Sequence, residues 1–344
     1  MARVLVTGGA GFIGSRCVRR AVRRGDEVVV LDDLSRGGSL ERLEHLRAEL
    51  GASSFALTRA SVTDADAVAA ACRAVDIVVH LAGQVAVTDA VRNPRHDFEA
   101  NALGTINVLE GLRRHAPGAV LIFASTNKVY GSLAHHPAEE QLTRYIVPSR
   151  PLGIDEAEPL DPHTPYACSN AAADQYVRDY ARMYGLRAVV FRQSCIYGPG
   201  QFGSEDQGWV AWMMRAALRD DEVTIFGDGK QVRDLLFVED LLDAFDSAVR
   251  RIDTCAGRAY NVGGGPDASV SIWHEFRRHL ADAAGVEPRV RLAPWRPADQ
   301  RVYISDVRRA GEDLGWRPAT ALHDGLRALR EWLVLHGRAA GADA

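Results

Sequence analysis

Lysine is nearly absent from this chain of 344 residues, because Lys128 and Lys230 are the only lysines among its 41 basic residues. An excess of positive charge is absent too, since 45 acidic residues give a formal net charge of −4. A general nucleic-acid-binding surface is therefore not expected, although a local anion pocket is compatible with this balance. No apolar run approaches the roughly 18 residues that a membrane-spanning helix needs. We expect neither nucleic acid nor a membrane among the partners.

A disulfide framework is not indicated either. The five cysteines are odd in number, widely scattered and without a Cys-x-x-Cys pair. They predict reduced, mostly buried thiols in a cytoplasmic protein, and we expect no bound metal. We also expect no signal peptide, because the first predicted strand begins at Arg3.

The pattern of apolar residues indicates an α/β fold. Short β-branched runs alternate with longer amphipathic segments over the first two thirds of the chain, which is typical of βαβ units with a parallel sheet. The run Val120-Leu121-Ile122-Phe123 is apolar without alternation, as expected of a sheet that is covered on both faces. Strands are expected at 3–7, 27–31, 54–58, 77–81, 119–124 and 188–192, and helices at 13–24, 64–74, 97–115 and 165–184.

We therefore predict a Rossmann-type, doubly wound parallel sheet with a smaller, discontinuous C-terminal domain. The alternation of strands and helices loosens after Tyr197-Gly198-Pro199-Gly200. The larger domain is expected to comprise residues 1–194 and about 223–250, and the smaller one about 195–222 and 251–335. Residues 338–344 are expected to be a frayed tail.

A glycine-rich turn follows the first expected strand. Gly8, Gly11 and Gly14 lie between that strand and the first expected helix. Such glycines permit a tight turn, let the backbone approach a pyrophosphate and allow close packing of the helix on the strand. The first helical turn, with Phe12 and Ile13, then offers free N–H groups to phosphate oxygens. The spacing is GxxGxxG rather than GxGxxG, and the alternative is a glycine-rich turn that binds nothing.

Asp32, at the end of the second expected strand, indicates a dinucleotide. A carboxylate about 20 residues after the glycines accepts hydrogen bonds from the ribose hydroxyls of NAD and repels the 2′-phosphate of NADP. Ser35 and Arg36 follow it, and an arginine near this position can instead pair with a phosphate. We predict NAD as the cofactor, bound by the larger domain. Further cofactor contacts are expected from Ser61, Val62, Leu81, Ala82, Gln84 and Asn101.

Hydroxyl groups suited to proton transfer follow the fifth expected strand and begin a later helix. Ser125 and Thr126 stand at the strand end, and Tyr166 lies one helical turn before Asn170. A hydroxyl at a strand end and a tyrosine with its i+4 partner on one helix face form a proton-transfer arrangement.

With these positions in place, the chain resembles the extended short-chain dehydrogenase/reductases, and among them the nucleotide-sugar epimerase/dehydratase group. Within that group it is most similar to the branch of CDP-paratose 2-epimerases, also called CDP-tyvelose epimerases. The similarity covers about residues 3–335. Its specific marks are segments 31–38, 80–87, 125–131, 193–199, 201–209, 227–234 and 295–301.

The resemblance implies an NAD-dependent epimerase. Tyr166 would remove a hydroxyl proton from the sugar while Ser125 or Thr126 holds that hydroxyl. Hydride would pass to NAD and return to the other face of a transient keto sugar, at C2 in the most similar branch. Dehydratases of the group carry an Asp-Glu pair where this chain has Asn127 and Lys128, so dehydration is disfavoured.

The resemblance also implies that the smaller domain binds a nucleotide sugar, a CDP-, UDP- or dTDP-hexose. Arg233 and Arg301 are the expected contacts to its diphosphate, because a guanidinium binds two phosphate oxygens at once; surface salt bridges are the alternative. Lys128 is expected in the active site, the alternative being a solvated lysine. The other predicted substrate contacts, with core packing as the alternative for the aromatic rings, are Gln193, Tyr197, Gln207, Trp209 and Trp295.

A homodimer or homotetramer is implied as well. Relatives pair the two helices expected at 97–115 and 165–184 into a four-helix bundle between subunits. Both helices carry apolar or small residues on more than one face, which packing within one subunit would also explain. These residues are Phe98, Ala102, Ile106, Leu109, Ala172, Tyr176, Tyr180 and Met183.

Two positions depart from the family pattern. Asn170 stands where the motif Tyr-x-x-x-Lys has its lysine, which binds the nicotinamide ribose and lowers the tyrosine pKa by its charge. Ser61 stands where relatives carry an aspartate near the adenine. The change at 170 leaves open a non-catalytic protein that binds NAD or a sugar nucleotide. A sugar-nucleotide dehydrogenase or decarboxylase is a third hypothesis.

Overall fold

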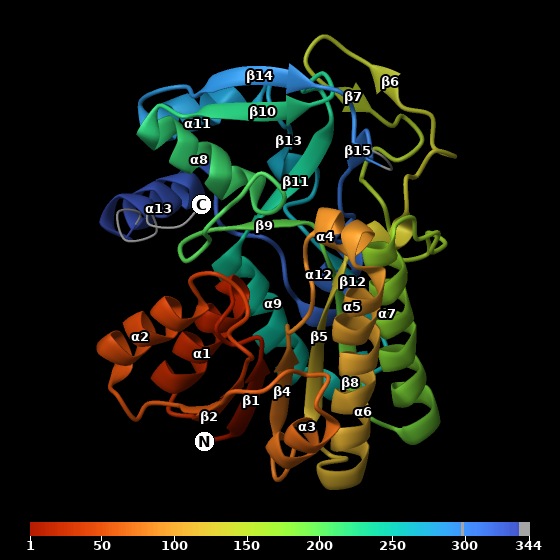
Figure 1. The fold of residues 1–344 in the computed structure, drawn as a ribbon. Coiled ribbons are helices and arrows are strands. Elements are labelled where there is room, and N and C mark those ends of the chain that lie inside the picture. Colours follow the sequence, from red (N-terminus) through yellow and green to blue (C-terminus); the bar gives the residue numbers. More distant parts are fainter. Residues whose placement is uncertain (297–298, 337–344) are drawn as a thin grey trace.

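A parallel sheet of seven strands forms the centre of the larger lobe in the computed structural model, which describes residues 1–296 and 299–336 (Figure 1). The strand order is β12-β8-β5-β4-β1-β2-β3, and every neighbouring pair is parallel. The predicted Rossmann-type α/β sheet is therefore confirmed. Its strands are β1 (Arg3–Thr7), β2 (Glu27–Leu31), β3 (Ala56–Thr58), β4 (Ile77–His80), β5 (Val120–Thr126), β8 (Arg187–Gln193) and β12 (Ala259–Val262).

Helices bury both faces of this sheet. Along β1, Val4 and Val6 pack against helices on one face, whereas Leu5 between them packs on the other. Because side chains alternate along a strand, coverage on both sides explains the apolar runs without alternation. The first face holds α1 (Phe12–Arg23), α2 (Ser39–Leu50), α9 (Val238–Arg250), α10 (Ile252–Cys255) and α12 (Arg308–Leu314). The second holds α3 (Ala65–Ala71), α6 (Gly104–His115) and α7 (Pro165–Tyr184).

Helix α3 is shorter than the expected 64–74. It begins after Asp64, whose carboxylate accepts hydrogen bonds from the amides of Asp66 and Ala67 at 3.1 and 3.0 Å. It ends before Ala74, where φ is 54°, and a left-handed residue cannot continue a right-handed helix.

The helix expected at 97–115 is interrupted. It consists of the end of α5 (Pro94–Phe98), a π-helical segment η1 (Glu99–Leu103), and α6, while α4 (Val87–Arg92) precedes them. Single π turns inside helices are frequent at functional sites. This one carries Asn101, whose contacts are described below.

Two strands extend further than expected. The strands predicted at 119–124 and 188–192 are β5 and β8, which reach Thr126 and Gln193, and these two residues pair in the sheet. Conversely, the strand expected at 54–58 begins only at Ala56, and the one expected at 77–81 ends at His80. The extension of β5 keeps Thr126 in the rigid sheet.

The smaller lobe lies above the sheet in Figure 1. Its core combines α8 (Trp209–Arg219), α11 (Phe276–Ala284) and α13 (Leu322–His336) with short sheets. Strands β10 (Glu222–Phe226) and β14 (Arg289–Ala293) form one parallel pair. Strand β11 (Val232–Phe237) pairs with β9 (Cys195–Tyr197), β13 (Ser269–Ser271) and β15 (Val302–Tyr303). The remaining elements are η2 (Asn127–Tyr130), β6 (Glu139–Glu140), β7 (Tyr145–Ile146) and η3 (Pro266–Ala268).

The division of the chain between the lobes differs from the expected one in two places. Strand β12 falls in the interval 251–335 that we expected in the smaller domain, yet it pairs with β8 in the large sheet. In the interval 223–250, α9 and Leu236 of β11 pack against the large sheet, whereas β10 and β11 pair within the sheets of the smaller lobe. The expected tail at 338–344 lies outside the described residues.

All five cysteines are free thiols, and Cys17, Cys72 and Cys255 are buried. Among the described residues, no helix has the length and apolar character that crossing a membrane requires.

Candidate active site

The glycine turn between β1 and α1 depends on the absence of side chains. Gly8 has φ of 69°, and a Cβ there would lie 2.8 Å from the amide nitrogen of Ala82. A Cβ on Gly14 would lie 2.1 Å from the carbonyl oxygen of Gly8, and one on Gly11 would lie 3.0 Å from it. No side chain caps α1, whose first residues are Phe12 and Ile13, so its N-terminal amides remain available to an anion.

Backbone amides hold Asp32 at the end of β2. Its carboxylate accepts hydrogen bonds from the amides of Ala10 and Leu34, both at 2.9 Å. Burial raises the pKa of Asp32, whereas these two bonds lower it. Arg42 donates to the carbonyl of Ala10 and so ties α2 to the same turn.

Asn101 links the turn after β4 to α5 and α7 by three hydrogen bonds. Its Oδ1 accepts a hydrogen bond from the amide of Gln84 at 2.8 Å, and its Nδ2 donates to Asp97 at 3.1 Å and to Ser169 at 3.0 Å. Ser169 also donates to Asp97 at 2.5 Å. The buried trio of Asp97, Asn101 and Ser169 joins the turn after β4 to α7. Sequence reasoning assigned Asn101 to the cofactor but missed Asp97 and Ser169, which no motif marks.

The other expected cofactor residues line the ends of the strands. The amides of Leu81 and Ala82 donate to the Thr7 hydroxyl, both at 3.2 Å, which fixes the backbone after β4 beside the glycine turn. Ser61 accepts hydrogen bonds from Thr63, and the carbonyl of Val62 accepts one from Asn107 at 2.9 Å. Ser35 donates to Asp33.

Thr126 and Ser125 point in different directions. The Ser125 hydroxyl donates to Asp174 at 3.1 Å, and Asp174 forms a buried pair with Arg192. The Thr126 side chain hydrogen-bonds Tyr166. Of the two candidates for holding a substrate hydroxyl, only Thr126 faces the tyrosine.

The environment of Tyr166 favours its neutral form. Burial raises the pKa of its phenol, and the charge of Asp97 acts in the same direction. The hydrogen bond with Thr126 and the charge of Arg36 act oppositely. Asn170 adds no charge, because its Nδ2 donates to the carbonyl of Tyr166 at 2.9 Å.

Lys128 faces the smaller lobe. Its Nζ lies 3.7 Å from Asp299 Oδ1 and 3.4 Å from Gln300 Oε1. Arg233 Nη2 donates to the same Asp299 oxygen at 2.7 Å. Burial lowers the pKa of Lys128 and the nearby Arg233 lowers it further, whereas Asp299 raises it. Lys128 and Arg233 therefore form a basic pair that shares one carboxylate.

Arg301 lies between two aromatic rings. Its guanidinium is 4.8 Å from the ring centre of Tyr145 and 5.3 Å from that of Trp295. The Tyr145 hydroxyl donates to Asp228 at 2.6 Å. Sequence reasoning missed Tyr145, because β7 is only two residues long and its surroundings have no periodic pattern. Asp228 lies in the family segment 227–234, but sequence reasoning assigned it no role.

Two glutamines reach the region between the lobes. Gln193 pairs with Thr126 across β5 and β8, and its buried Nε2 has no hydrogen-bond partner among the described residues. A ligand hydroxyl could therefore use this donor. Gln207 accepts a hydrogen bond from Arg36 Nη2 at 2.5 Å, which links the smaller lobe to the loop after β2.

Two predicted substrate contacts pack elsewhere. Tyr197 is 1% exposed and packs against Phe237, so it belongs to the core of the smaller lobe and we withdraw its assignment to the substrate. Trp209 packs edge-on against Phe276 at 4.8 Å, and its Nε1 lies 3.4 Å from Cys195 Sγ. For both rings the core-packing alternative describes the observed contacts.

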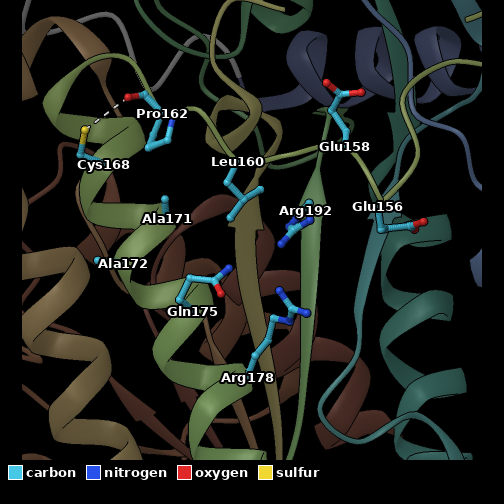
Figure 2. Close-up of a pocket in the computed structure, with 10 residues that line it drawn as sticks. All are labelled: Glu156, Glu158, Leu160, Pro162, Cys168, Ala171, Ala172, Gln175, Arg178 and Arg192. Carbon is cyan, nitrogen blue, oxygen red and sulfur yellow. Dashed lines mark hydrogen bonds between the residues drawn. The ribbon is translucent and has the colours of Figure 1, made fainter.

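A separate hollow of about 570 Å³ lies beside α7 (Figure 2). Its lining includes Glu158, Cys168, Gln175 and Arg178, and it contains none of the residues predicted for the cofactor or the substrate.

These features define a class of protein. A doubly wound parallel sheet carries a glycine turn after β1, a carboxylate after β2 and a Thr126–Tyr166 pair between β5 and α7. The glycine turn leaves no room for side chains, and no side chain caps the N-terminus of α1. Both features fit the pyrophosphate of a dinucleotide. The arrangement is that of an NAD-dependent short-chain dehydrogenase/reductase.

The comparisons with known proteins agree. A sequence profile described as the NAD dependent epimerase/dehydratase family matches residues 4–263, and the chain belongs to this family. It is 39% identical over 337 residues to CDP-paratose 2-epimerase of Salmonella typhi, an alignment that covers 96% of this chain and 98% of that protein. The fold is similar to the UDP-glucose 4-epimerase of Thermus thermophilus in complex with NAD, with TM-score 0.79, 32% identity and coverage of 96% and 99% of the two chains. It is also similar to the Thermotoga maritima UDP-glucose 4-epimerase with UDP-glucose, with TM-score 0.82, 30% identity and coverage of 97% and 99%.

The chain is thus an NAD-dependent epimerase, and the cofactor predicted from the sequence is confirmed.

Proposed function

We propose that the protein epimerises a nucleotide sugar at C2 and that the nucleotide is CDP. The observation that carries this proposal is the 39% identity to a CDP-paratose 2-epimerase over 98% of that protein's length. Asn127 and Lys128 replace the Asp-Glu pair of the dehydratase branch, which argues against dehydration only.

The residues of the site have distinct tasks in this reaction. Gly8, Gly11 and Gly14 would hold the pyrophosphate of NAD, and Asp32 its adenosine ribose. Bound NAD would supply the chemistry of taking up a hydride and giving it back. Tyr166 would remove the proton of the C2 hydroxyl as the keto sugar forms and return it after the sugar has turned over.

Thr126 and Gln193 would position the reacting hydroxyl. Thr126 already bonds Tyr166, and the free Nε2 of Gln193 lies on the neighbouring strand. Arg233 and Arg301 would bind the diphosphate, with Lys128 as a third positive group beside Arg233. Displacement of Asp299 from this basic pair would accompany substrate binding.

The substrate class can be tested by thermal unfolding. A ligand at 100 times its dissociation constant stabilises a protein by about 2.7 kcal/mol, which is a readily measured shift in Tm. With NAD present, a CDP-hexose should raise Tm more than the UDP or dTDP analogue. If NAD shifts Tm but none of the sugar nucleotides does, the substrate class is wrong.

The reacting carbon can be tested by deuterium at C2 of the CDP-sugar. The epimerised product should keep the label at C2 and turnover should be slower than with hydrogen, because the same hydride leaves and returns. Deuterium at C4 should leave the rate unchanged. Slower turnover with the C4 label instead would place the reaction at C4.

A second candidate function rests on Asn170. A non-catalytic protein that binds NAD or a sugar nucleotide is favoured by the lack of a cation at this position. The deuterium experiment separates the two candidates, since an inert binder forms no product.

We also propose a homodimer built on α7 and the neighbouring α5–η1–α6 segment, in a reducing compartment such as the cytoplasm that suits free thiols. Of the residues predicted for the interface, Phe98, Tyr176 and Met183 are exposed, whereas Ala102 and Leu109 are buried within the subunit. Exposed apolar side chains on adjacent helices can be buried in a helical bundle between two subunits.

The dimer predicts twice the 37.5 kDa chain mass in light scattering at micromolar concentration. Charges in the interface are costly, so Tyr176→Glu with Met183→Glu should give the monomer mass. Leu335→Glu, on the exposed face of α13, is the control and should leave the mass unchanged. A 37.5 kDa particle from the unmodified protein would refute the dimer.

A further inference from the structure

Two histidines and one glutamate converge outside the catalytic site. His135 and His136 follow η2, and Glu158 lies in the segment that leads to α7. His135 Nε2 lies 2.5 Å from Glu158 Oε1, and His136 Nε2 lies 2.9 Å from Glu158 Oε2. The three side chains therefore each direct one ligand atom to a common point, with all of these atoms within 4.8 Å of one another.

Arg150 also contacts this cluster. Arg150 Nε donates to His136 Nε2 at 3.4 Å, and a guanidinium can only donate. The shorter contact of this ring nitrogen is the one with Glu158 Oε2, at 2.9 Å. In the tautomer with its proton on Nδ1, a neutral imidazole presents the Nε2 lone pair to a cation held beside Glu158.

The two imidazole rings lie 4.2 Å apart, and Arg150 Nη2 already pairs with Glu158 at 2.9 Å. The Glu158 side chain is almost fully buried, whereas that of His135 is half-exposed. Neutral histidines are the form in which imidazole binds a metal.

We propose that His135, His136 and Glu158 bind a divalent transition-metal ion of the Zn²⁺ class. Two imidazole nitrogens and one carboxylate oxygen, with water in a fourth position, form a common zinc ligand set. Imidazole selects such ions over Mg²⁺ and Ca²⁺, which prefer oxygen ligands. The sequence alone did not predict this site, because Glu158 is 22 positions from His136 in the chain.

The surrounding structure supports the ligands. Leu133 is buried, has φ of 56° and accepts a hydrogen bond from the amide of His136 at 3.0 Å, so a tight turn presents both rings. Bonds of about 2.0–2.2 Å to zinc place tetrahedral ligand atoms roughly 3.3 Å apart. The cluster reaches this spacing by small rotations, chiefly of the half-exposed His135. Arg150 can remain as a hydrogen-bonded partner of the ligating carboxylate.

An ion at this site would connect two segments that frame the catalytic residues. One segment follows Lys128 and η2, and the other leads to Pro165 and Tyr166 at the start of α7. Figure 2 shows Glu158 at the end of the hollow beside α7, with Glu156 and Arg192 nearby. Metal binding is therefore expected to stabilise the fold.

The experiment is calorimetric titration of untagged, chelator-treated protein with ZnCl₂, followed by thermal unfolding. One equivalent of Zn²⁺ per chain should bind and raise Tm. His135→Asn and His136→Asn together should weaken binding by at least about 100-fold, since even loss of an outer partner of a metal site costs about 10–100-fold. Circular dichroism establishes that the variant is folded, and the exposed His135 alone provides a milder second variant.

Two controls separate this site from adventitious binding. His163→Asn removes an exposed histidine that lies 3.1 Å from Asp161, and Cys168→Ser removes the exposed thiol beside the hollow. Both variants should bind Zn²⁺ as the unmodified protein does. The proposal is overturned if the unmodified protein shows no saturable binding, or if the double histidine variant binds as tightly.

Discussion

Replacement of Tyr166 by phenylalanine is expected to lower the epimerisation rate by about 10²–10⁴-fold, the range that a positioned acid or base contributes. The variant removes only the phenolic oxygen, which bonds Thr126 and lies on the first turn of α7. NAD binding should be retained, because the glycine turn and Asp32 belong to other elements. The measurement is product formation from the CDP-sugar, with NAD binding followed by fluorescence.

Tyr184→Phe is the matched control for this prediction. Tyr184 lies at the other end of α7, is exposed, and its ring contacts Arg113. This variant should turn over at the rate of the unmodified protein. If Tyr166→Phe loses less than tenfold, another group transfers the proton and the assignment of Tyr166 as the base fails.

The sequence predicts those parts of the site whose geometry depends only on residues close together in the chain. The glycine turn is predictable because its backbone leaves no room for side chains, as the 2.1 Å contact of a Gly14 Cβ with Gly8 illustrates. Asp32 follows from its place at a strand end, and Tyr166 and Asn170 from their spacing on one helix. The parallel sheet follows from apolar runs that alternate with helices.

The direction of a side chain depends on partners far away in the chain and was not predictable. Ser125 turns toward Asp174, 49 positions away, so Thr126 alone faces Tyr166. Lys128 turns toward Gln300, 172 positions away, because Asp299 and Gln300 supply its acceptors. Strand β12 has four residues, too few for a periodic signal, and its place follows from pairing with β8.

Asn170 determines how well Tyr166 can act as a base near neutral pH. An unperturbed tyrosine has a pKa of about 10, so near pH 7.5 only about one molecule in several hundred carries a phenolate. Burial raises the pKa of Tyr166 further and makes that fraction smaller. Lys128 does not compensate, because its ammonium lies beside Asp299 and Arg233. Arg36 is the cation that lowers the pKa of Tyr166, and Gln207 holds its guanidinium.

We therefore expect the unmodified protein to turn over slowly at pH 7 and faster as the pH rises past 8. A group with a raised pKa is deprotonated only at higher pH, so the rate of a phenolate-dependent step follows the phenolate fraction upward. Asn170→Lys would place a cation one helical turn from Tyr166. A cation within about 4–6 Å lowers such a pKa by about 1–3 units.

The lysine variant should accordingly increase the rate at pH 7 by tenfold or more and shift the pH profile to lower values. Asn170→Met is the matched control, because methionine has a similar length without charge and should not shift the profile. The measurement is the rate of epimerisation between pH 6 and 10 for the three proteins, with NAD binding measured in parallel. If the unmodified protein epimerises its substrate rapidly at pH 7 and Asn170→Lys lowers that rate, Asn170 has a catalytic role of its own. Tyr166 would then act without the help of a cation at this position.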